Sequence, residues 1–140
     1  MAARSWKPAA RPASALTHRG SAQAVTFVTG HAAAGSEPDL DWESLAKANQ
    51  TVVIYMGVST AAGIAARLIG AGRAGSTPAL VVENASRPDE RRIVTTLAEL
   101  PAAAEQVAGP ALLIVGEAMA LAQASGDTAA FEPKLELRVK

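Results

Sequence analysis

Residues 51–72, TVVIYMGVSTAAGIAARLIGAG, decide the fold class of this chain. Thr51–Met56 is a continuous apolar run that stops at a glycine, a pattern typical of a strand covered on both faces. Ser59–Ala71 follows a helical period, and Ser59 or Thr60 stands in the cap position. The apolar stripe of this helix consists of Ala61, Ile64, Ala65, Leu68 and Ile69, and Gly70 and Gly72 end it. A strand followed by an amphipathic helix indicates an α/β fold.

The alternation of strand and helix continues on both sides of this stretch. Four more short runs are expected as strands: Ala24–Thr29, Ala79–Glu83, Ala111–Val115 and Arg92–Thr96. Three more segments are expected as helices: Asp41–Ala48, Leu97–Ala108 and Ala118–Ala124. Asp39 or Asp41 can cap the first of these helices. Strand, helix and strand at this spacing predict a single layered α/β sheet with flanking helices and a largely parallel core.

Length and composition limit the possible functions. The 140 residues are enough for one domain. Thirteen basic and thirteen acidic residues cancel, which removes any whole-chain argument for binding nucleic acid or an anionic membrane. The absence of cysteine excludes disulfides, thiolate metal sites and a cysteine nucleophile. His18 and His31 do not have the spacing of a zinc site, so no metal is expected. No apolar run approaches the ~20 residues that span a bilayer.

The composition divides the chain into three parts. Residues 1–14 are rich in Ala, Arg, Pro and Ser and show no hydrophobic period, so we expect a disordered tail. Their basic, acid-free composition loosely resembles an organelle transit peptide, although the prolines disfavour an amphipathic helix. Residues 15–125 form the expected domain, and residues 126–140 form a C-terminal extension.

Most motifs of known chemistry are absent from this sequence. Gly57-Val-Ser-Thr-Ala-Ala-Gly63 lies where a phosphate loop would lie, but it has neither the Lys-Ser/Thr of a P-loop nor GxGxxG spacing. No Gly-x-Ser-x-Gly elbow occurs, and the acids near Asp41 are better explained as helix caps than as an acid–base pair. What remains is a group of strand ends, namely Gly30-His31, Met56-Gly57 and Asn84-Ala85. Because ligands bind beyond the carboxyl ends of parallel strands, we expect a small-molecule site there.

Several longer motifs occur together in a recognisable order. They are Leu16-Thr17-His18-Arg19-Gly20, VTFVTGH (25–31), LDWESLA (40–46), VIYMG (53–57), Thr77-Pro78-Ala79, VENAS (82–86) and LLIVGE (112–117). In this order and spacing, the chain resembles the C-terminal half of the uroporphyrinogen-III C-methyltransferases, in the tetrapyrrole methylase superfamily. The resemblance covers residues 16–121. It implies that this chain is the second domain of the tetrapyrrole methylase fold.

The resemblance implies a chemistry for the whole enzyme. Members of the family transfer methyl groups from S-adenosylmethionine to C2 and then C7 of uroporphyrinogen III, giving precorrin-2 for sirohaem and cobalamin synthesis. A Gly-rich GGD loop and a Thr-Ala pair of the first domain would complete the cofactor cleft. No GGD loop is present here, and residues 1–14, which stand where the Thr-Ala segment would lie, do not match it. A truncated gene, a frame error or a deliberate fragment would each explain this. We therefore expect the 140-residue chain alone to be inactive.

Three positions correspond to binding residues of the family. Met56, in Tyr-Met-Gly, matches a methionine that contacts the cofactor through its backbone and flanks the substrate. Ala85 matches a small residue whose main chain meets the adenosine. Arg19 matches an arginine that can hold a carboxylate of the tetrapyrrole, for which a guanidinium is well suited. The resemblance gives this chain no catalytic residue and no metal ligand, and His18 and His31 are expected to be structural or to line the cleft.

Two alternatives remain open at this stage. The chain could belong to another member of the superfamily with a different acceptor, or it could be a non-catalytic domain. The resemblance further implies a homodimer in the full-length enzyme, a tetrapyrrole substrate, and no nucleic acid or membrane partner. It also implies a cytoplasmic location.

Overall fold

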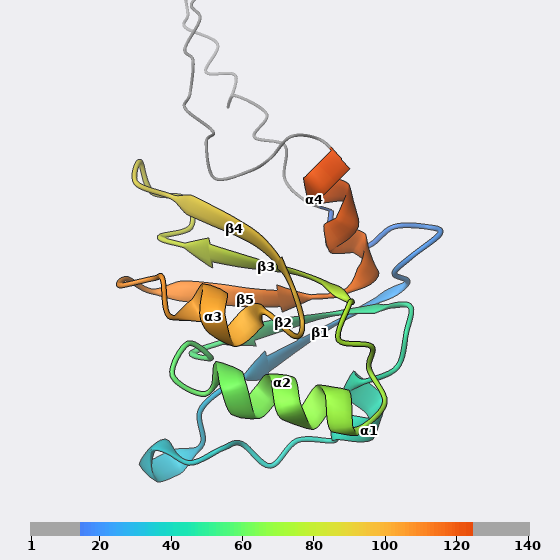
Figure 1. The fold of residues 1–140 in the computed structure, drawn as a ribbon, viewed down its shortest axis with the longest axis horizontal. Helices are drawn as coiled ribbons and strands as arrows, with labels where there is room; N and C mark the ends of the chain where they lie inside the picture. The colour runs from blue at the N-terminus through green and yellow to red at the C-terminus, as the bar shows by residue number, and fades with distance from the viewer. Residues whose placement is uncertain (1–14, 125–140) are drawn as a thin grey trace, which may run out of the picture.

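The computed structural model describes residues 15–124 as one mixed sheet with helices packed against it (Figure 1). The strands are β1 (Ala24–Thr29), β2 (Gln50–Tyr55), β3 (Pro78–Glu83), β4 (Arg91–Thr96) and β5 (Ala111–Val115). The helices are α1 (Trp42–Leu45), α2 (Ala61–Gly70), α3 (Leu100–Ala104) and α4 (Ala120–Ala124), with 3-10 turns η1 (Ala33–Gly35) and η2 (Glu117–Met119). The expected tail, residues 1–14, and the expected extension, residues 126–140, lie outside the described residues.

The local predictions hold for the strands and less well for the helices. Each of the five predicted strands is present within one residue at either end. Helix α3 is shorter than predicted because the Leu97 N–H donates to the Thr77 carbonyl (2.8 Å), which places Leu97 in a turn ahead of the helix. Asp41 does cap α1, since its Oδ1 accepts the Ser44 N–H at 3.1 Å. Thr60 takes the cap position of α2 without a side-chain capping bond.

The strand order β1-β2-β5-β3-β4 corrects the expectation of a largely parallel core. β1 and β2 pair in parallel, whereas β5 pairs antiparallel with both β2 and β3, and β3 pairs antiparallel with β4. Each connection that contains a helix does join strands of the same direction, as βαβ units require. The parallel expectation is wrong because β5 inserts between β2 and β3, and because a short turn over residues 84–90 makes β3 and β4 a hairpin.

This topology brings several strand ends to one edge of the sheet. Since β5 runs opposite to both of its neighbours, β2 and β3 share one direction, and β1 shares it too. The carboxyl ends of β1, β2 and β3 therefore meet at the edge where β5 begins with Ala111. The group of strand ends expected from the sequence is thus present.

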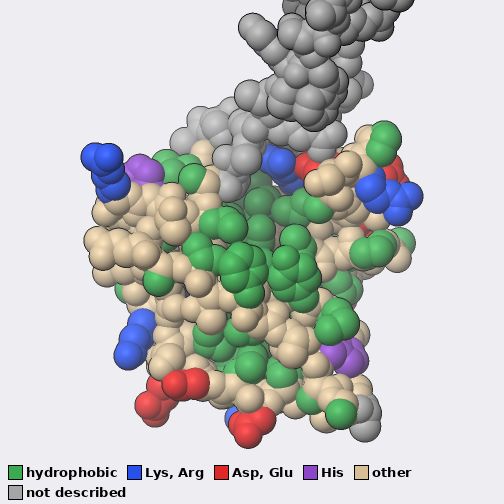
Figure 2. Space-filling view, turned by 180° about the vertical axis from the view of Figure 1, so that it is seen from behind, with side chains coloured by type: hydrophobic (Ala, Val, Ile, Leu, Met, Phe, Trp, Pro, Cys, Tyr) green, Lys and Arg blue, Asp and Glu red, His purple; other side chains and the backbone are tan. Residues whose placement is uncertain are grey.

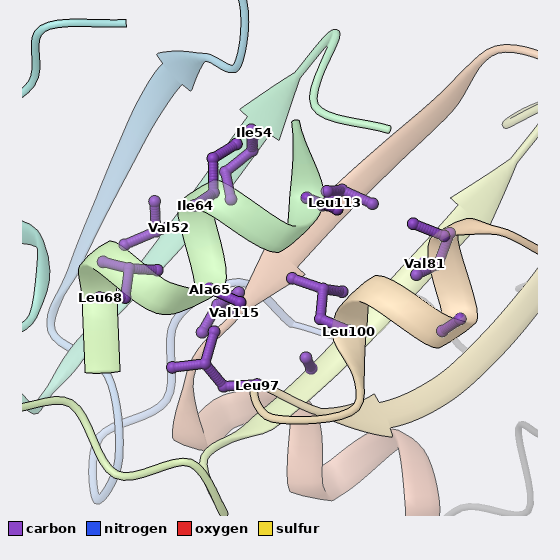
Figure 3. Packing of buried hydrophobic residues seen from close by; sticks show 14 of the residues in the cluster. Val52, Ile54, Ile64, Ala65, Leu68, Val81, Leu97, Leu100, Leu113 and Val115 are labelled. Carbon is purple, nitrogen blue, oxygen red and sulfur yellow. The ribbon is translucent and has the colours of Figure 1, made fainter. Parts of the chain in front are cut away.

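The sheet has an apolar layer on each face because successive side chains of a strand point to opposite sides. On one face, α2 and α3 cover Val52 and Ile54 of β2, which lie close to Ile64 and Leu68 of α2 (Figure 3). A smaller cluster on the opposite face joins Val53, Leu80, Val82 and Ile114 to Ala118 and Met119 of η2. Across residues 15–124, no helix has the length and apolar character needed to cross a membrane.

Candidate functional site

A pocket of about 990 Å³ lies at the edge where the three strands end. Its lining comes from the loops after β1, β2 and β3 and from the start of β5. The lining residues are His31, Ala32, Ala33, Tyr55, Met56, Val58, Ser59, Val82, Asn84, Ala85, Arg87, Gly109, Pro110, Ala111 and Leu112. The volume is within the range of small-molecule sites, and the lining is mainly apolar with a few polar groups.

Close contact between two glycines joins the loops that follow β1 and β2. The Gly30 N–H donates to the Tyr55 carbonyl at 2.6 Å, and a Cβ on Gly30 would lie 2.4 Å from the Gly57 Cα. No side chain fits at that distance, so glycine is required at position 30. The Thr60 hydroxyl donates to the Gly30 carbonyl at 2.6 Å, which ties the start of α2 to the loop after β1. The two loops therefore form one rigid wall of the pocket.

Met56 projects from this wall. Its φ of +54° is in the left-handed region, an uncommon conformation for a non-glycine residue. The residue as a whole is 64% exposed. The Met56 carbonyl oxygen lies 3.3 Å from Nδ1 of His31, which donates to it in the tautomer that carries a proton on Nδ1. His31 therefore lines the pocket, in agreement with one of its two expected roles, and contacts the backbone of Met56.

A buried carboxylate holds the opposite wall. Glu83, at the end of β3, is 8% exposed, and its Oε1 accepts the N–H groups of Gly109 and Ala108, both at 2.8 Å. These two backbone hydrogen bonds hold the pKa of Glu83 below its usual value, against the opposing effect of burial. The next residue, Asn84, donates its N–H to the Pro110 carbonyl at 2.9 Å. The loop before β5 is thereby fixed against the end of β3, beside Ala85.

The pocket adjoins an apolar face of the sheet. Figure 2 shows hydrophobic side chains gathered on the side away from α2 and α3. Phe27 and Tyr55, which are 58% and 47% exposed, belong to β1 and β2 and hold their ring centroids 6.3 Å apart. Tyr55 lines the pocket as well.

Arg19 lies away from this pocket. It is part of a tight turn in which His18 and Ala22 exchange backbone hydrogen bonds, and it lines a separate depression with Thr17 and Gln23. The Gln23 N–H donates to the Asn49 carbonyl, which places this turn at the amino end of β2. Because β2 has six residues at ~3.3 Å each, Arg19 lies about 20 Å from Met56. The structure therefore brings Met56 and Ala85 together and leaves Arg19 at the other end of the sheet.

Sequence reasoning missed other residues that line or hold the pocket. Gly109 and Pro110 line the pocket just before β5, whereas a parallel sheet would have put the start of that strand at the opposite edge. Arg87 follows the Val-Glu-Asn-Ala-Ser motif and carried no signal of its own. Glu83 was recognised within that motif but not as the acceptor that holds residues 108 and 109. Among residues 15–124, no three His, Asp or Glu side chains are grouped as metal ligands.

Comparison with known proteins identifies the family. The sequence model of the tetrapyrrole (corrin/porphyrin) methylases matches residues 8–101. This chain belongs to the tetrapyrrole methylase family. The siroheme synthase of Chromobacterium violaceum is 54% identical over 109 residues, which are 76% of this chain and 23% of that protein. The siroheme synthase of Azotobacter vinelandii is 51% identical over 108 residues, 76% of this chain and 23% of that protein.

Solved structures of the family share the fold. A uroporphyrin-III C-methyltransferase from Thermus thermophilus, in complex with S-adenosylhomocysteine, is 38% identical with a TM-score of 0.67. That match covers 76% of this chain and 48% of the other. The cobalt precorrin-4 methyltransferase CbiF is 26% identical with a TM-score of 0.65, over 75% of this chain and 45% of the other. The chain thus spans about a quarter of the curated relatives and about half of the solved structures that it matches.

Proposed function

We propose that the pocket at the ends of β2 and β3 is one side of an S-adenosylmethionine site, in a methyltransferase that converts uroporphyrinogen III to precorrin-2 by methylation at C2 and C7. The observation that carries this proposal is that Met56 and Ala85 line the same pocket. The two residues are 29 positions apart in the sequence, and the family resemblance assigns both to the cofactor. A similar protein from Thermus thermophilus binds S-adenosylhomocysteine.

The residues of the pocket suit this cofactor. When bound, the cofactor supplies the electrophilic sulfonium methyl group. Ala85 is exposed and small, so the main chain at the end of β3 is accessible to a flat adenosine. Met56 presents a soft, polarizable thioether to the pocket. Its left-handed backbone conformation ends the extended strand, so its backbone groups leave the direction of β2. In this proposal the chain orients the reactants and excludes water, and no proton transfer is assigned to it.

The comparisons favour uroporphyrinogen III as the acceptor. Identity is 38% to the uroporphyrin-III C-methyltransferase from Thermus thermophilus and 26% to the cobalt precorrin-4 methyltransferase. Under this proposal the present chain corresponds to the second domain over residues 15–125. It binds cofactor but does not by itself methylate uroporphyrinogen III at a useful rate, which an assay with labelled S-adenosylmethionine measures.

Arg19 keeps a proposed role in holding a carboxylate of the tetrapyrrole. Because Arg19 lies about 20 Å from Met56 by the length of β2, this role requires a different path of the segment before β1 or a contribution from a second copy. Of these two arrangements we propose the second copy, and hence a homodimer, which sedimentation of the purified protein tests.

Calorimetric titration with S-adenosylhomocysteine tests the cofactor site. Ala85→Leu places a bulky side chain where the main chain must approach the adenosine, so we expect binding to weaken at least about tenfold, ~1.4 kcal/mol. Ala66→Leu, on the exposed side of α2 and away from the pocket, is the matched control and should bind like the wild type. Equal affinity of the two variants would contradict the assignment of Ala85.

A further inference from the structure

Arg87 introduces a full positive charge into a pocket that is otherwise mainly apolar. Among the described residues that line this pocket, Arg87 is the only Lys, Arg, Asp or Glu. Arg19, the residue that the family resemblance assigns to the carboxylates of the acceptor, lines a different depression. Within residues 15–124, the pocket that holds Met56 and Ala85 therefore has Arg87 as its one Lys or Arg side chain, and Arg19 is not part of it.

The turn that carries Arg87 is held in place by its neighbours. The Arg87 N–H donates to the Asn84 carbonyl at 3.0 Å. The Asn84 side chain donates to Oδ2 of Asp89 at 3.0 Å, and Oδ1 of Asp89 lies 3.5 Å from Nε of Arg87. The Ser86 N–H donates to Glu90 at 2.7 Å. Arg87 is thus positioned at the pocket by contacts that do not involve the lining residues after β1 and β2.

The ion pair with Asp89 leaves the guanidinium available to a ligand. Both side chains are exposed, 65% for Arg87 and 60% for Asp89, and exposed ion pairs contribute little to stability. A guanidinium has five N–H donors on more than one edge, so a contact through Nε does not occupy it. A ligand carboxylate can therefore bind the same group in the bidentate geometry that arginine favours.

We propose that Arg87 binds a carboxylate of the methyl acceptor in this pocket and so selects polycarboxylate tetrapyrroles. The inference rests on the proposed function, because uroporphyrinogen III carries eight carboxylates. It assigns Arg87 to acceptor specificity and leaves the cofactor to Met56 and Ala85.

Absorbance titrations of the 140-residue protein with uroporphyrin III, in the presence of S-adenosylhomocysteine, test this role. We expect Arg87→Ala to weaken uroporphyrin III binding about tenfold, the lower end for a bond between charged groups, because the site is exposed. The affinity of Arg87→Lys for uroporphyrin III should lie between those of the wild type and Arg87→Ala, because lysine keeps the charge but loses the bidentate geometry. Coproporphyrin III, with four carboxylates, should bind the wild type more weakly than uroporphyrin III. Affinity for S-adenosylhomocysteine should be the same in every variant.

Arg67→Ala is the matched control. Arg67 is also exposed and also pairs through Nε, with Glu37 at 3.3 Å, but it lies on α2 and does not line the pocket. If Arg87→Ala and Arg67→Ala bind uroporphyrin III equally, the inference is wrong. Binding of S-adenosylhomocysteine without any binding of uroporphyrin III to the wild type would also overturn it, while leaving the cofactor site intact. Failure to bind either molecule would instead overturn the proposed function, and this inference with it.

Discussion

The Glu83 carboxylate predicts an effect of acid on the loop that precedes β5. Its carboxylate accepts the N–H groups of Gly109 and Ala108, which lowers its pKa below the ordinary value of 4.5. A group whose pKa is lowered by folding stabilises the native state above the unfolded pKa and loses that contribution as the pH falls through the folded pKa. We therefore expect the loop before β5 to loosen only below about pH 4.5, when Glu83 takes up a proton.

Amide hydrogen exchange measures this effect at a single residue. In the wild type, exchange at the Gly109 amide, corrected for its intrinsic pH dependence, should be faster below pH 4.5 than at neutral pH. In Glu83→Ala it should already be faster than in the wild type at neutral pH. Glu83→Gln keeps an acceptor oxygen without a titrating charge, so its exchange should be nearly independent of pH. Asp41→Asn is the control, because Asp41 also accepts a backbone N–H but caps α1. A Gly109 amide that exchanges equally in wild type and Glu83→Ala would show that the carboxylate does not hold the loop.

At the scale of the element, β2 places Ile54 in the core, whereas the neighbouring strand β1 places Phe27 on the surface. Ile54 is fully buried under α2. Ile54→Asp would leave an unpaired charge there, at a cost of several kcal/mol, which is comparable to the stability of a small domain. We expect this variant to be unfolded by circular dichroism. Phe27→Asp on the neighbouring strand is the control, since Phe27 is 58% exposed, and it should remain folded. A folded Ile54→Asp protein would contradict the placement of β2.

The strands could be predicted from the sequence because each is a short apolar run between residues that break it. Thr51–Met56 and Ala111–Val115 are two examples. Their order in the sheet could not be predicted in the same way. The insertion of β5 between β2 and β3 depends on pairing between residues far apart in the chain, such as Val52 with Val115 and Val81 with Leu113. Local periodicity carries no information about such partners.

The candidate site, like the fold, could be predicted only in part from the sequence. Met56 and Ala85 follow strands that run in the same direction, so a rule about strand ends brings them together. Glu83 holds the loop before β5, and Arg87 lines the pocket from the turn after β3. The positions of that loop and that turn depend on the inserted strand, so neither residue could be found by the same rule. Arg19 was placed with Met56 only by resemblance, and no local element of the described chain brings it there.

For the whole molecule, the open apolar face beside the pocket bears on whether this chain can exclude water from a bound cofactor. Tyr55 and Met56 line the pocket and are 47% and 64% exposed, and the exposed ring of Phe27 lies 6.3 Å from that of Tyr55. A site that depends on excluding water is not complete with so much of its wall open. The chain spans about half of the solved structures that it matches. This is why we expect binding, rather than turnover, from the 140-residue protein.

The proposed cofactor site lies where β2 and β3 end. Its most direct test is a titration of ¹⁵N-labelled protein with S-adenosylhomocysteine, followed by the backbone amide signals. We expect shifts to concentrate at Met56, Ala85 and Gly109, with little change at Arg19. Shifts that centre on the turn around Arg19, or a spectrum that S-adenosylhomocysteine does not change, would contradict this account.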